Sequence, residues 1–269
     1  MNDSNIFTLS FPEAKDIVVS GDIHGNFNQL VFKLCIQYQM RNAVLIVAGD
    51  CGFGFEKQKS YENMVKRNTK RMNEANNWIV FIRGNHDNPA YFDGYTFRHK
   101  RFIAVPDYTI LQACSHTVLC AGGGISIDRQ YRLQVWEKRQ VRSVSDSQAD
   151  KLTRNVYWGT EAPIFDKEKM IAISAKYAVD TVITHTAPSF CELLTKNNLN
   201  AWTAIDNNLL SDITSERATM DKLHDRLKTD HHPMSHWFYG HFHQSWHCDI
   251  NGTLFRMLDI MEFCQIYQL

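Results

Sequence analysis

Three short apolar runs occur in the first third of the chain, and each is followed within two residues by a glycine and then a polar residue. The runs cover residues 17–19, 43–48 and 78–82. They are continuous and too short for helices, so we predict buried parallel strands. Residues 26–41 carry apolar side chains at helical spacing, with Asn26 as a candidate N-cap. A strand, a helix and a strand in this order predict a right-handed βαβ unit, whose two strands end at the same edge of the sheet.

The rest of the chain alternates between strand-like runs and helical patterns. We predict further strands at residues 102–105, 108–112, 117–121, 181–183, 237–239, 246–250 and 253–258. The last two form a hairpin, because the Asn251-Gly252 pair between them is typical of a type I′ turn. We predict helices at residues 56–76, 166–178 and 204–229. Asp166 caps the second helix, and the third is either continuous or broken near residues 214–215.

The spacing of hydrophobic residues between positions 122 and 163 follows neither a helical nor a strand period. This stretch begins with three glycines and continues as a polar, aromatic segment, so we predict a long irregular loop of the kind that is often functional. Because no helix clearly starts after the glycines, we interpret them as a tight turn rather than as a phosphate-binding loop. We find no linker, internal repeat or low-complexity tract that would divide the chain into domains.

The composition is that of an ordinary globular protein. Hydrophobic residues make up 44% of the 269 positions, and the formal net charge is zero, so no overall field attracts nucleic acid or membranes. The seven cysteines are scattered and form no C-x-x-C pair, which indicates thiols in a reducing compartment. No apolar run approaches the length of a membrane span, and residues 1–16 lack the features of a signal peptide. We therefore expect a cytoplasmic protein with no membrane partner.

Two basic clusters leave a nucleic-acid partner open, although the net charge does not support one. Six lysines and arginines lie within residues 57–71, and residues 98–101 read Arg-His-Lys-Arg. Three glutamates lie among these charges within residues 56–76, and no aromatic series accompanies them, so we interpret the first cluster as the solvated face of a helix.

Five segments that follow predicted strands carry side chains suited to metal binding or acid–base chemistry. These side chains are Asp22 and His24, Asp50, Asn85 and His86, His185, and His241 and His243. A single Asp after a strand is commonly a turn former. If all these groups met in one crevice, however, their unpaired polarity would be severe unless cations balanced it. Imidazole and carboxylate donors without cysteine suit Mn, Fe or Zn better than Mg or Ca.

These segments resemble the motifs of the calcineurin-like metallophosphoesterase family. They read Gly-Asp-Ile-His-Gly, Gly-Asp-Cys-Gly, Gly-Asn-His-Asp, Thr-His and Gly-His-Phe-His, in this order, within residues 21–243. One such segment would be a weak match, but five in register are highly specific. The resemblance implies an α/β (α+β) fold, a four-layer α/β/β/α sandwich of two mixed β-sheets flanked by helices. It also implies one domain over residues 1–269, with insertions near 125–165 and 188–236.

The resemblance further implies two divalent metal ions, with Mn²⁺ expected and Fe or Zn as alternatives. Asp22, His24 and His243 would hold the first ion. Asn85, His185 and His241 would hold the second, with Asp50 as the bridge between the two and Asn85 also in contact with phosphate. A hydroxide that bridges two such ions can attack phosphorus in line while both ions polarise the phosphoryl oxygens.

His86 corresponds to the general acid that protonates the leaving group. Many relatives carry a second Asp three residues after the bridging one, followed by Arg-Gly, whereas this chain has Phe53 and no Arg-Gly. This departure argues against the protein-phosphatase branch. Asp87 is the local substitute for orienting His86, and Asp128 is a more distant one. Arg129 and Arg132 either bind phosphate oxygens or are solvated surface arginines.

We therefore expect a metal-dependent hydrolase of small-molecule phosphoesters, either monoesters or diesters, with nucleotide derivatives among them. A protein Ser/Thr phosphatase and a nuclease are the alternatives within the enzyme class. A scaffold that retains the metal-binding fold without catalysis is the alternative from another class.

Overall fold

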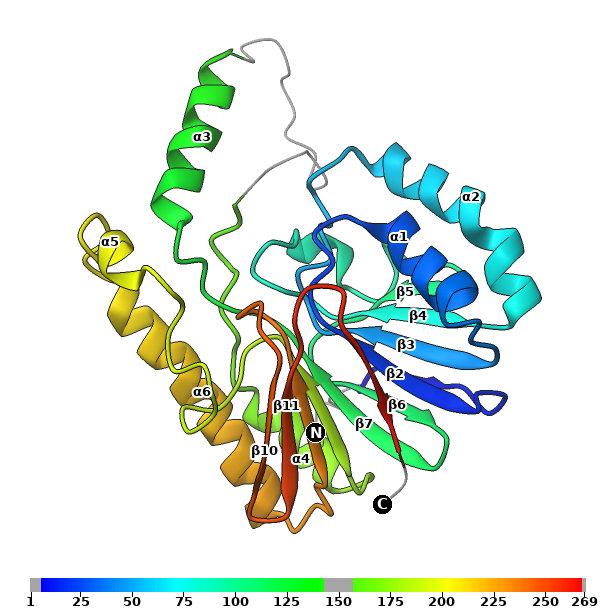
Figure 1. Ribbon diagram of the computed structural model, residues 1–269. Helices are drawn as coiled ribbons and strands as arrows, with labels where there is room; N and C mark the ends of the chain where they lie inside the picture. Colours follow the sequence, from blue (N-terminus) through cyan, green and yellow to red (C-terminus); the bar gives the residue numbers. More distant parts are fainter. Residues whose placement is uncertain (1–5, 143–156, 268–269) are drawn as a thin grey trace.

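Two β-sheets lie face to face in the computed structural model, which describes residues 6–142 and 157–267 (Figure 1). The seven-stranded sheet has the order β1 (Thr8–Ser10), β6 (Thr109–Ala113), β7 (His116–Ala121), β8 (Thr181–Thr184), β9 (His236–Tyr239), β11 (Thr253–Met257) and β10 (Trp246–Ile250). The five-stranded sheet has the order β12 (Phe263–Ile266), β2 (Asp16–Ser20), β3 (Ala43–Val47), β4 (Trp78–Phe81) and β5 (Phe102–Ala104). Both sheets are mixed. The pairs β6–β7, β10–β11 and β12–β2 are antiparallel, and the other pairs are parallel.

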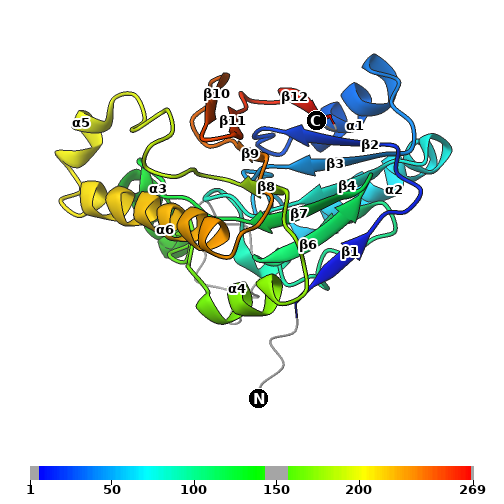
Figure 2. The same cartoon turned by 90° about the horizontal axis from the view of Figure 1, so that it is seen from below.

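Helices cover the outer face of each sheet, which confirms the predicted four-layer sandwich (Figure 2). The five-stranded sheet is covered by α1 (Phe27–Phe32), its π-helical continuation Lys33–Gln37, and α2 (Gln58–Ala75). The seven-stranded sheet is covered by α4 (Lys167–Ser174) and α6 (Leu209–Thr229). Two further helices, α3 (Arg129–Arg142) and α5 (Leu199–Thr203), lie beyond the ends of the strands (Figure 1). A 3₁₀ turn covers Pro89–Tyr91.

The central strands are continuous apolar runs because both of their faces are buried. On β3, Leu45 packs toward α1 and α2, whereas its neighbour Ile46 packs between the two sheets. This alternation follows from the two-residue period of a strand. On the other sheet, Ile183 faces the space between the sheets and Val182 faces α4 and α6. Three apolar layers thus hold the sandwich together and fix where the strands end.

Most predicted elements form close to their expected bounds. Asp166 caps α4 as predicted, because its carboxylate accepts a 3.0 Å hydrogen bond from the backbone amide of Lys169. Helix α6 runs without a break past residues 214–215. Asn251 and Gly252 both have a positive φ, 53° and 75°, as a type I′ turn requires.

The prediction of an irregular loop over residues 122–163 is wrong for Arg129–Arg142, because these residues form helix α3. This helix presents few apolar residues, so it leaves no hydrophobic period in the sequence. Ion pairs fix its first turn instead, since Arg129 binds Asp206 and Arg132 binds Asp128. The part of the predicted loop that covers residues 143–156 lies outside the described residues.

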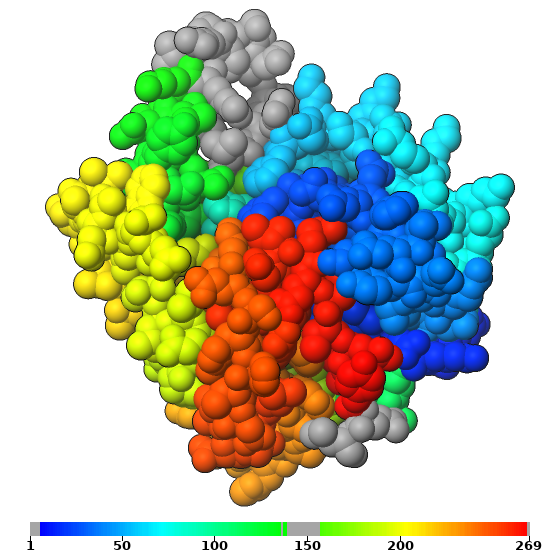
Figure 3. Space-filling model, in the orientation of Figure 1, coloured from blue at the N-terminus to red at the C-terminus, as the bar shows by residue number. Residues whose placement is uncertain are grey.

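The short elements β1, β12 and α5 also went unpredicted. Strand β12 pairs antiparallel with β2 at the sheet edge and is only partly buried, which gives it a weak pattern. The C-terminal segment lies beside α1 on one face of the molecule (Figure 3), where the ammonium of Lys33 lies 4.9 Å from the ring centroid of Phe263. No helix in the described parts of the chain has both the length and the apolar character needed to cross a membrane.

Phe53, three residues after Asp50, is the centre of an aromatic cluster beneath the strand ends. It is fully buried, and six ring centroids lie 4.7–5.5 Å from its own: those of Phe27, Tyr61, Phe81, Tyr91, Phe92 and Phe97. This packing explains why the chain has no Asp here, since a carboxylate would lie unpaired among rings.

We expect Phe53→Ala to lower the free energy of unfolding by about 3–5 kcal/mol, because it leaves a cavity among close-packed rings. Phe53→Asp should prevent folding. Urea denaturation measures both effects. The control is Phe32→Ala, since Phe32 is half exposed and its loss should change stability by about 0.5 kcal/mol or less. Equal losses for Phe53→Ala and Phe32→Ala would contradict the role of Phe53.

Candidate metal and active site

The seven predicted metal donors come together where the two sheets adjoin. They follow the carboxyl ends of β2, β3 and β4 in one sheet and of β8 and β9 in the other. Parallel neighbouring strands end at the same edge, so their following residues converge. The donors also join the sheets. His185 Nδ1 after β8 donates to the backbone oxygen of Ala48 at 2.8 Å, and the backbone amide of His241 donates to Asp22 Oδ1 at 2.9 Å.

The first predicted set, Asp22, His24 and His243, is compact. His243 Nε2 lies 2.9 Å from Asp22 Oδ2, and His24 Nε2 lies 3.1 Å from His243 Nε2 and 3.7 Å from Asp22 Oδ2. With Asp50, each of these residues offers one ligand atom within 4.8 Å of all the others.

The second predicted set, Asn85, His185 and His241, is deeply buried beside the first. Asn85 Oδ1 lies 2.8 Å from His185 Nε2 and 2.9 Å from His241 Nδ1, and the two ring nitrogens are 3.2 Å apart. Asp50 Oδ1 lies 3.2 Å from His185 Nε2, so Asp50 is shared by the two sets. This is the arrangement that a bridging ligand needs.

The protonation of His185 shows why this cluster suits a cation. Its Nδ1 must carry a proton, because it donates to a carbonyl oxygen. In the neutral ring, Nε2 therefore presents a lone pair to Asn85 Oδ1 and Asp50 Oδ1, which are also acceptors. Metal-binding histidines have this pattern, with the outer nitrogen donating to a carbonyl. In addition, Asp50 Oδ2 is buried and has no hydrogen-bond partner among the described residues.

The pKa of His185 reports the same attraction for positive charge. Burial alone would lower this pKa, but the carboxylates of Asp50 and Asp22 raise it to about 9. Carboxylate oxygens and imidazole nitrogens on both sides of Asp50 thus fit two divalent cations.

The backbone is strained at the donors themselves. Four of the seven have a positive φ: His24 (43°), Asp50 (45°), His241 (68°) and His243 (55°). A non-glycine residue in this region costs of order 1–3 kcal/mol, and such residues cluster at functional sites. The rest of the fold therefore forces these side chains toward the common centre.

Two glycines beside the donors allow the backbone to approach closely. At Gly49, which has a φ of 91°, an added Cβ would lie 2.3 Å from His185 Nδ1. At Gly240 it would lie 2.2 Å from Asp22 Oδ1. A side chain at either position would displace a donor, which explains physically why a glycine precedes Asp50 and His241.

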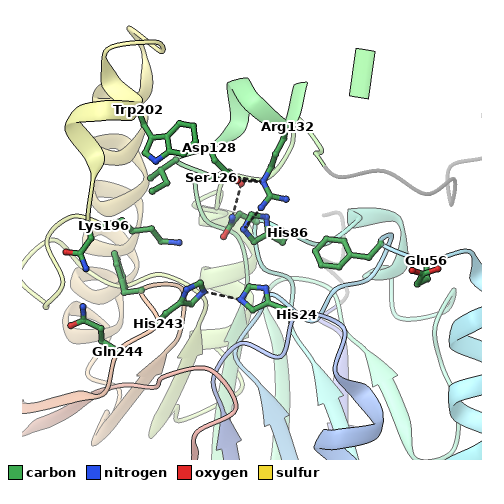
Figure 4. A pocket seen from close by; sticks show the side chains of 15 residues that line it. His24, Glu56, His86, Ser126, Asp128, Arg132, Lys196, Trp202, His243 and Gln244 are labelled. Carbon is green, nitrogen blue, oxygen red and sulfur yellow. Dashed lines mark hydrogen bonds and ion pairs between the residues drawn. The ribbon is translucent and has the colours of Figure 1, made fainter. Parts of the chain in front are cut away.

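A cavity of about 820 Å³ opens above the donors (Figure 4). His86 lies in its wall, with Nε2 3.7 Å from Asp50 Oδ2 and 3.3 Å from a terminal nitrogen of Arg132. Nε2 therefore accepts from Arg132, and the proton of the neutral ring is on Nδ1. Burial lowers the pKa of His86 to about 4, although Asp50 acts in the opposite direction.

The structure brings Arg132 and Asp128, but not Arg129, to this cavity. Arg132 Nε lies 2.8 Å from both carboxylate oxygens of Asp128, which aligns the guanidinium beside His86. The side chain of Arg129 lies between two other carboxylates, with Nε 2.5 Å from Asp206 Oδ2 and a terminal nitrogen 2.7 Å from Asp212 Oδ2. These ion pairs neutralise Arg129 outside the cavity lining.

Asp87 contacts the backbone rather than His86. Its two oxygens accept hydrogen bonds of 2.7–3.0 Å from four amides, those of Cys51, Gly52, Phe53 and Gly84. Asp87 thereby ties the loop after β3 to the loop after β4. Its contacts are those of an anchor that holds Asp50 and Asn85 in register.

Four residues of the site were not anticipated from the sequence: Ser126, Glu161, Lys196 and Trp202. Lys196 and Trp202 line one side of the cavity, and Glu56 lies on the other (Figure 4). Ser126 donates its hydroxyl to buried Glu161. All four lie in the segments expected to be insertions, where no motif marks them. A lysine and a tryptophan in the same polar segment were the only available signal, and it is not specific.

Comparisons with known proteins agree with the fold. A model of the calcineurin-like phosphoesterase family matches residues 15–245, which include all five motif segments. The protein TT1561 of Thermus thermophilus is similar in structure at 11% identity, with a TM-score of 0.51, and the alignment covers 92% of this chain and 90% of that one. A dimetal phosphatase from Danio rerio aligns at 10% identity with a TM-score of 0.47, over 93% of this chain and 88% of that one. No curated protein matches the sequence.

Asp50→Asn should lose bound metal and activity together, because the shared carboxylate serves both donor sets and an amide carries no charge. Metal analysis of the purified variant by mass spectrometry, after loading with Mn²⁺, measures the loss. Asp225→Asn is the matched control, since Asp225 is an exposed aspartate on α6. A variant that keeps two tightly bound ions and full turnover would show that Asp50 is not the bridge.

Proposed function

Because the chain belongs to the calcineurin-like phosphoesterase family, we propose that it hydrolyses small phosphoesters with the help of two divalent metal ions, with Mn²⁺ as the expected metal. One observation carries the proposal: two sets of donors share the buried carboxylate of Asp50, and one oxygen of that carboxylate has no hydrogen-bond partner among the described residues. Two bound ions would supply an activated water and would polarise the phosphoryl oxygens for in-line attack.

We assign Asp22, His24 and His243 to one ion. Asn85, His185 and His241 are assigned to the other. Asp50 binds both. The compactness of each set supports this division. Asn85 also contacts a phosphoryl oxygen in this proposal, and its position in the cavity lining supports that role.

His86 acts as the general acid that protonates the leaving oxygen. Its position in the cavity wall beside Asp50 supports this role. In the free protein the ring is neutral because it is buried. An anionic phosphoryl group bound beside the ring raises its pKa and favours the imidazolium that can donate a proton. Arg132, held by Asp128, faces the same space and binds phosphoryl oxygens.

The walls of the cavity support an organic phosphoester with a planar group, such as a nucleotide derivative. The volume of about 820 Å³ leaves ample room beyond one phosphoryl group. The side chains of Lys196 and Trp202 face this space and have no hydrogen bond, ion pair or ring contact within the described residues. A cation and an aromatic plane that have no such contacts within the described residues suit an anionic group and a base.

The structure gives the nuclease alternative no support. Among the described residues that line the cavity, none belongs to α2 or to residues 98–101. Arg101 is buried, where it donates to Asn73 and Asn76.

We also propose a cytoplasmic location, which the seven free cysteines support.

His86→Ala should slow the hydrolysis of alkyl phosphates by about 10²–10⁴-fold, because a poor leaving group needs a proton. p-Nitrophenyl phosphate should be affected far less, since its leaving group is stable as an anion. Steady-state kinetics on both substrates measure the difference. His247→Ala, which removes an exposed histidine, is the control. Equal losses on both substrates would rule out the acid role.

Trp202→Ala should raise KM for AMP by about 5–150-fold, the range that corresponds to a stacking contribution of 1–3 kcal/mol per base. KM for ribose 5-phosphate, which lacks the base, should stay unchanged. Trp202→Phe keeps an aromatic plane and should retain most of the affinity for AMP. Equal effects of Trp202→Ala on both substrates would argue against a base at this wall.

A further inference from the structure

A chain of three hydrogen-bonded side chains leads away from the second donor set. Asn85 Nδ2 lies 2.8 Å from Ser126 Oγ, and Ser126 Oγ lies 2.6 Å from Glu161 Oε2. The backbone amide of Ser126 donates to the other oxygen, Glu161 Oε1, at 3.1 Å. Ser126 is 1% exposed and Glu161 is 3% exposed, so water competes little for these contacts. Neither residue belongs to the five motif segments.

The side-chain amide of Asn85 has to face one way for the site to work. Its oxygen can bind a cation, whereas its NH₂ group presents hydrogens and cannot. The two orientations differ by half a turn about a torsion that has little intrinsic preference. The hydrogen bonds around the amide therefore decide which atom faces His185 and His241.

The hydrogen bonds of Ser126 allow only one of the two orientations of the Asn85 amide. Glu161, as a carboxylate, accepts hydrogen bonds and donates none. The hydroxyl proton of Ser126 must therefore point to Glu161, which leaves Ser126 Oγ as an acceptor toward Asn85. The group that donates to Ser126 is then the NH₂ of Asn85, and its oxygen faces the other donors.

We propose that Ser126 and Glu161 are positioning residues that hold the oxygen of Asn85 toward the second metal ion. This inference rests on the proposed metal site. Neither side chain needs to touch the ion or the substrate for this role, since both act through the direction of the Asn85 amide.

Glu161 is held by the same loop that carries Asn85. Its backbone oxygen accepts from Arg83 at 2.8 Å and from the amide of Gly124 at 3.0 Å. Arg83 is itself buried and pairs with Asp107 at 2.9 Å. Because Arg83 precedes Asn85 by two residues, the acceptor and the amide it orients are fixed to one piece of backbone. The backbone of Glu161 is thus held in a fixed position relative to Asn85.

Metal titration tests the role directly and needs no substrate. Metal-free protein is titrated with Mn²⁺ at pH 8, above the pKa of about 7 to which burial raises Glu161, so that its carboxylate is ionised. The wild type should bind two equivalents. In Ser126→Ala and in Glu161→Gln, one equivalent should keep its affinity and the other should weaken roughly 10–100-fold, as loss of an outer partner does at metal sites. Circular dichroism checks that each variant is folded.

Ser174→Ala is the matched control, because Ser174 on α4 also donates its hydroxyl to a carboxylate, that of Asp230, away from the donors. This variant should bind both ions as the wild type does. Wild-type affinity for both ions in Ser126→Ala and Glu161→Gln would overturn the inference. If the wild type binds two ions but hydrolyses no phosphoester, the proposed function fails and the positioning role stands or falls on the titration alone.

A second variant tests whether Glu161 orients the Asn85 amide or only stabilises the loop that carries Asn85. Asn85→Asp offers two equivalent oxygens, so no orientation has to be chosen. In that background, Glu161→Gln should cause no further loss of Mn²⁺ affinity, which a double-mutant cycle measures. An equal loss in both backgrounds would mean that Glu161 only supports the loop, and would overturn the proposed role.

Discussion

The buried carboxylate of Asp50 is the group on which the rest of the site depends. One oxygen accepts from the backbone amide of His86 at 2.8 Å and lies close to His185, and the other has no hydrogen-bond partner among the described residues. A fully buried charge of this kind is costly unless positive charge compensates it. The histidines around it supply only part of that compensation, which is why the site suits divalent cations. The strained φ angles and close glycine contacts around it follow from the need to bring several donors to one point.

The sandwich supports this concentration of polar groups with well-packed layers beneath it. Phe53, three residues after Asp50, fills the centre of an aromatic cluster, and Asp87 joins the two neighbouring loops through four backbone amides. The loop that carries Asp50 is thus fixed from below by apolar packing and from the side by hydrogen bonds. Such preorganisation lets the donors keep their geometry although it is unfavourable for the isolated backbone.

The donors and the walls of the cavity come from different parts of the fold. The donors follow strand ends, and their chemistry is that of metal ions and phosphoryl groups in general. The walls come from the segments around α3 and α5, which contribute Arg132, Lys196 and Trp202 to the cavity. The same segments contribute Ser126, which with Glu161 reaches back to a donor. The proposed substrate preference and the proposed ordering of Asn85 therefore both rest on the regions that differ most from a regular sandwich.

The sequence alone determined the central strands and the polar residues that follow them, because continuous apolar runs that end at glycine and a ligand-type residue leave few alternatives. The four layers and the set of seven candidate donors followed from the resemblance of the five motif segments to a known family. The sequence could not separate Arg132 from Arg129, since only the packing of α3 against residues 206 and 212 decides which guanidinium reaches the cavity. It also could not show that Asp87 bonds to backbone amides, or that Glu161 lies behind Asn85. These contacts join residues far apart in the chain, and they depend on side-chain directions that no local pattern encodes. Tertiary structure alone fixed them, because short polar contacts form only once the apolar layers have set the distances.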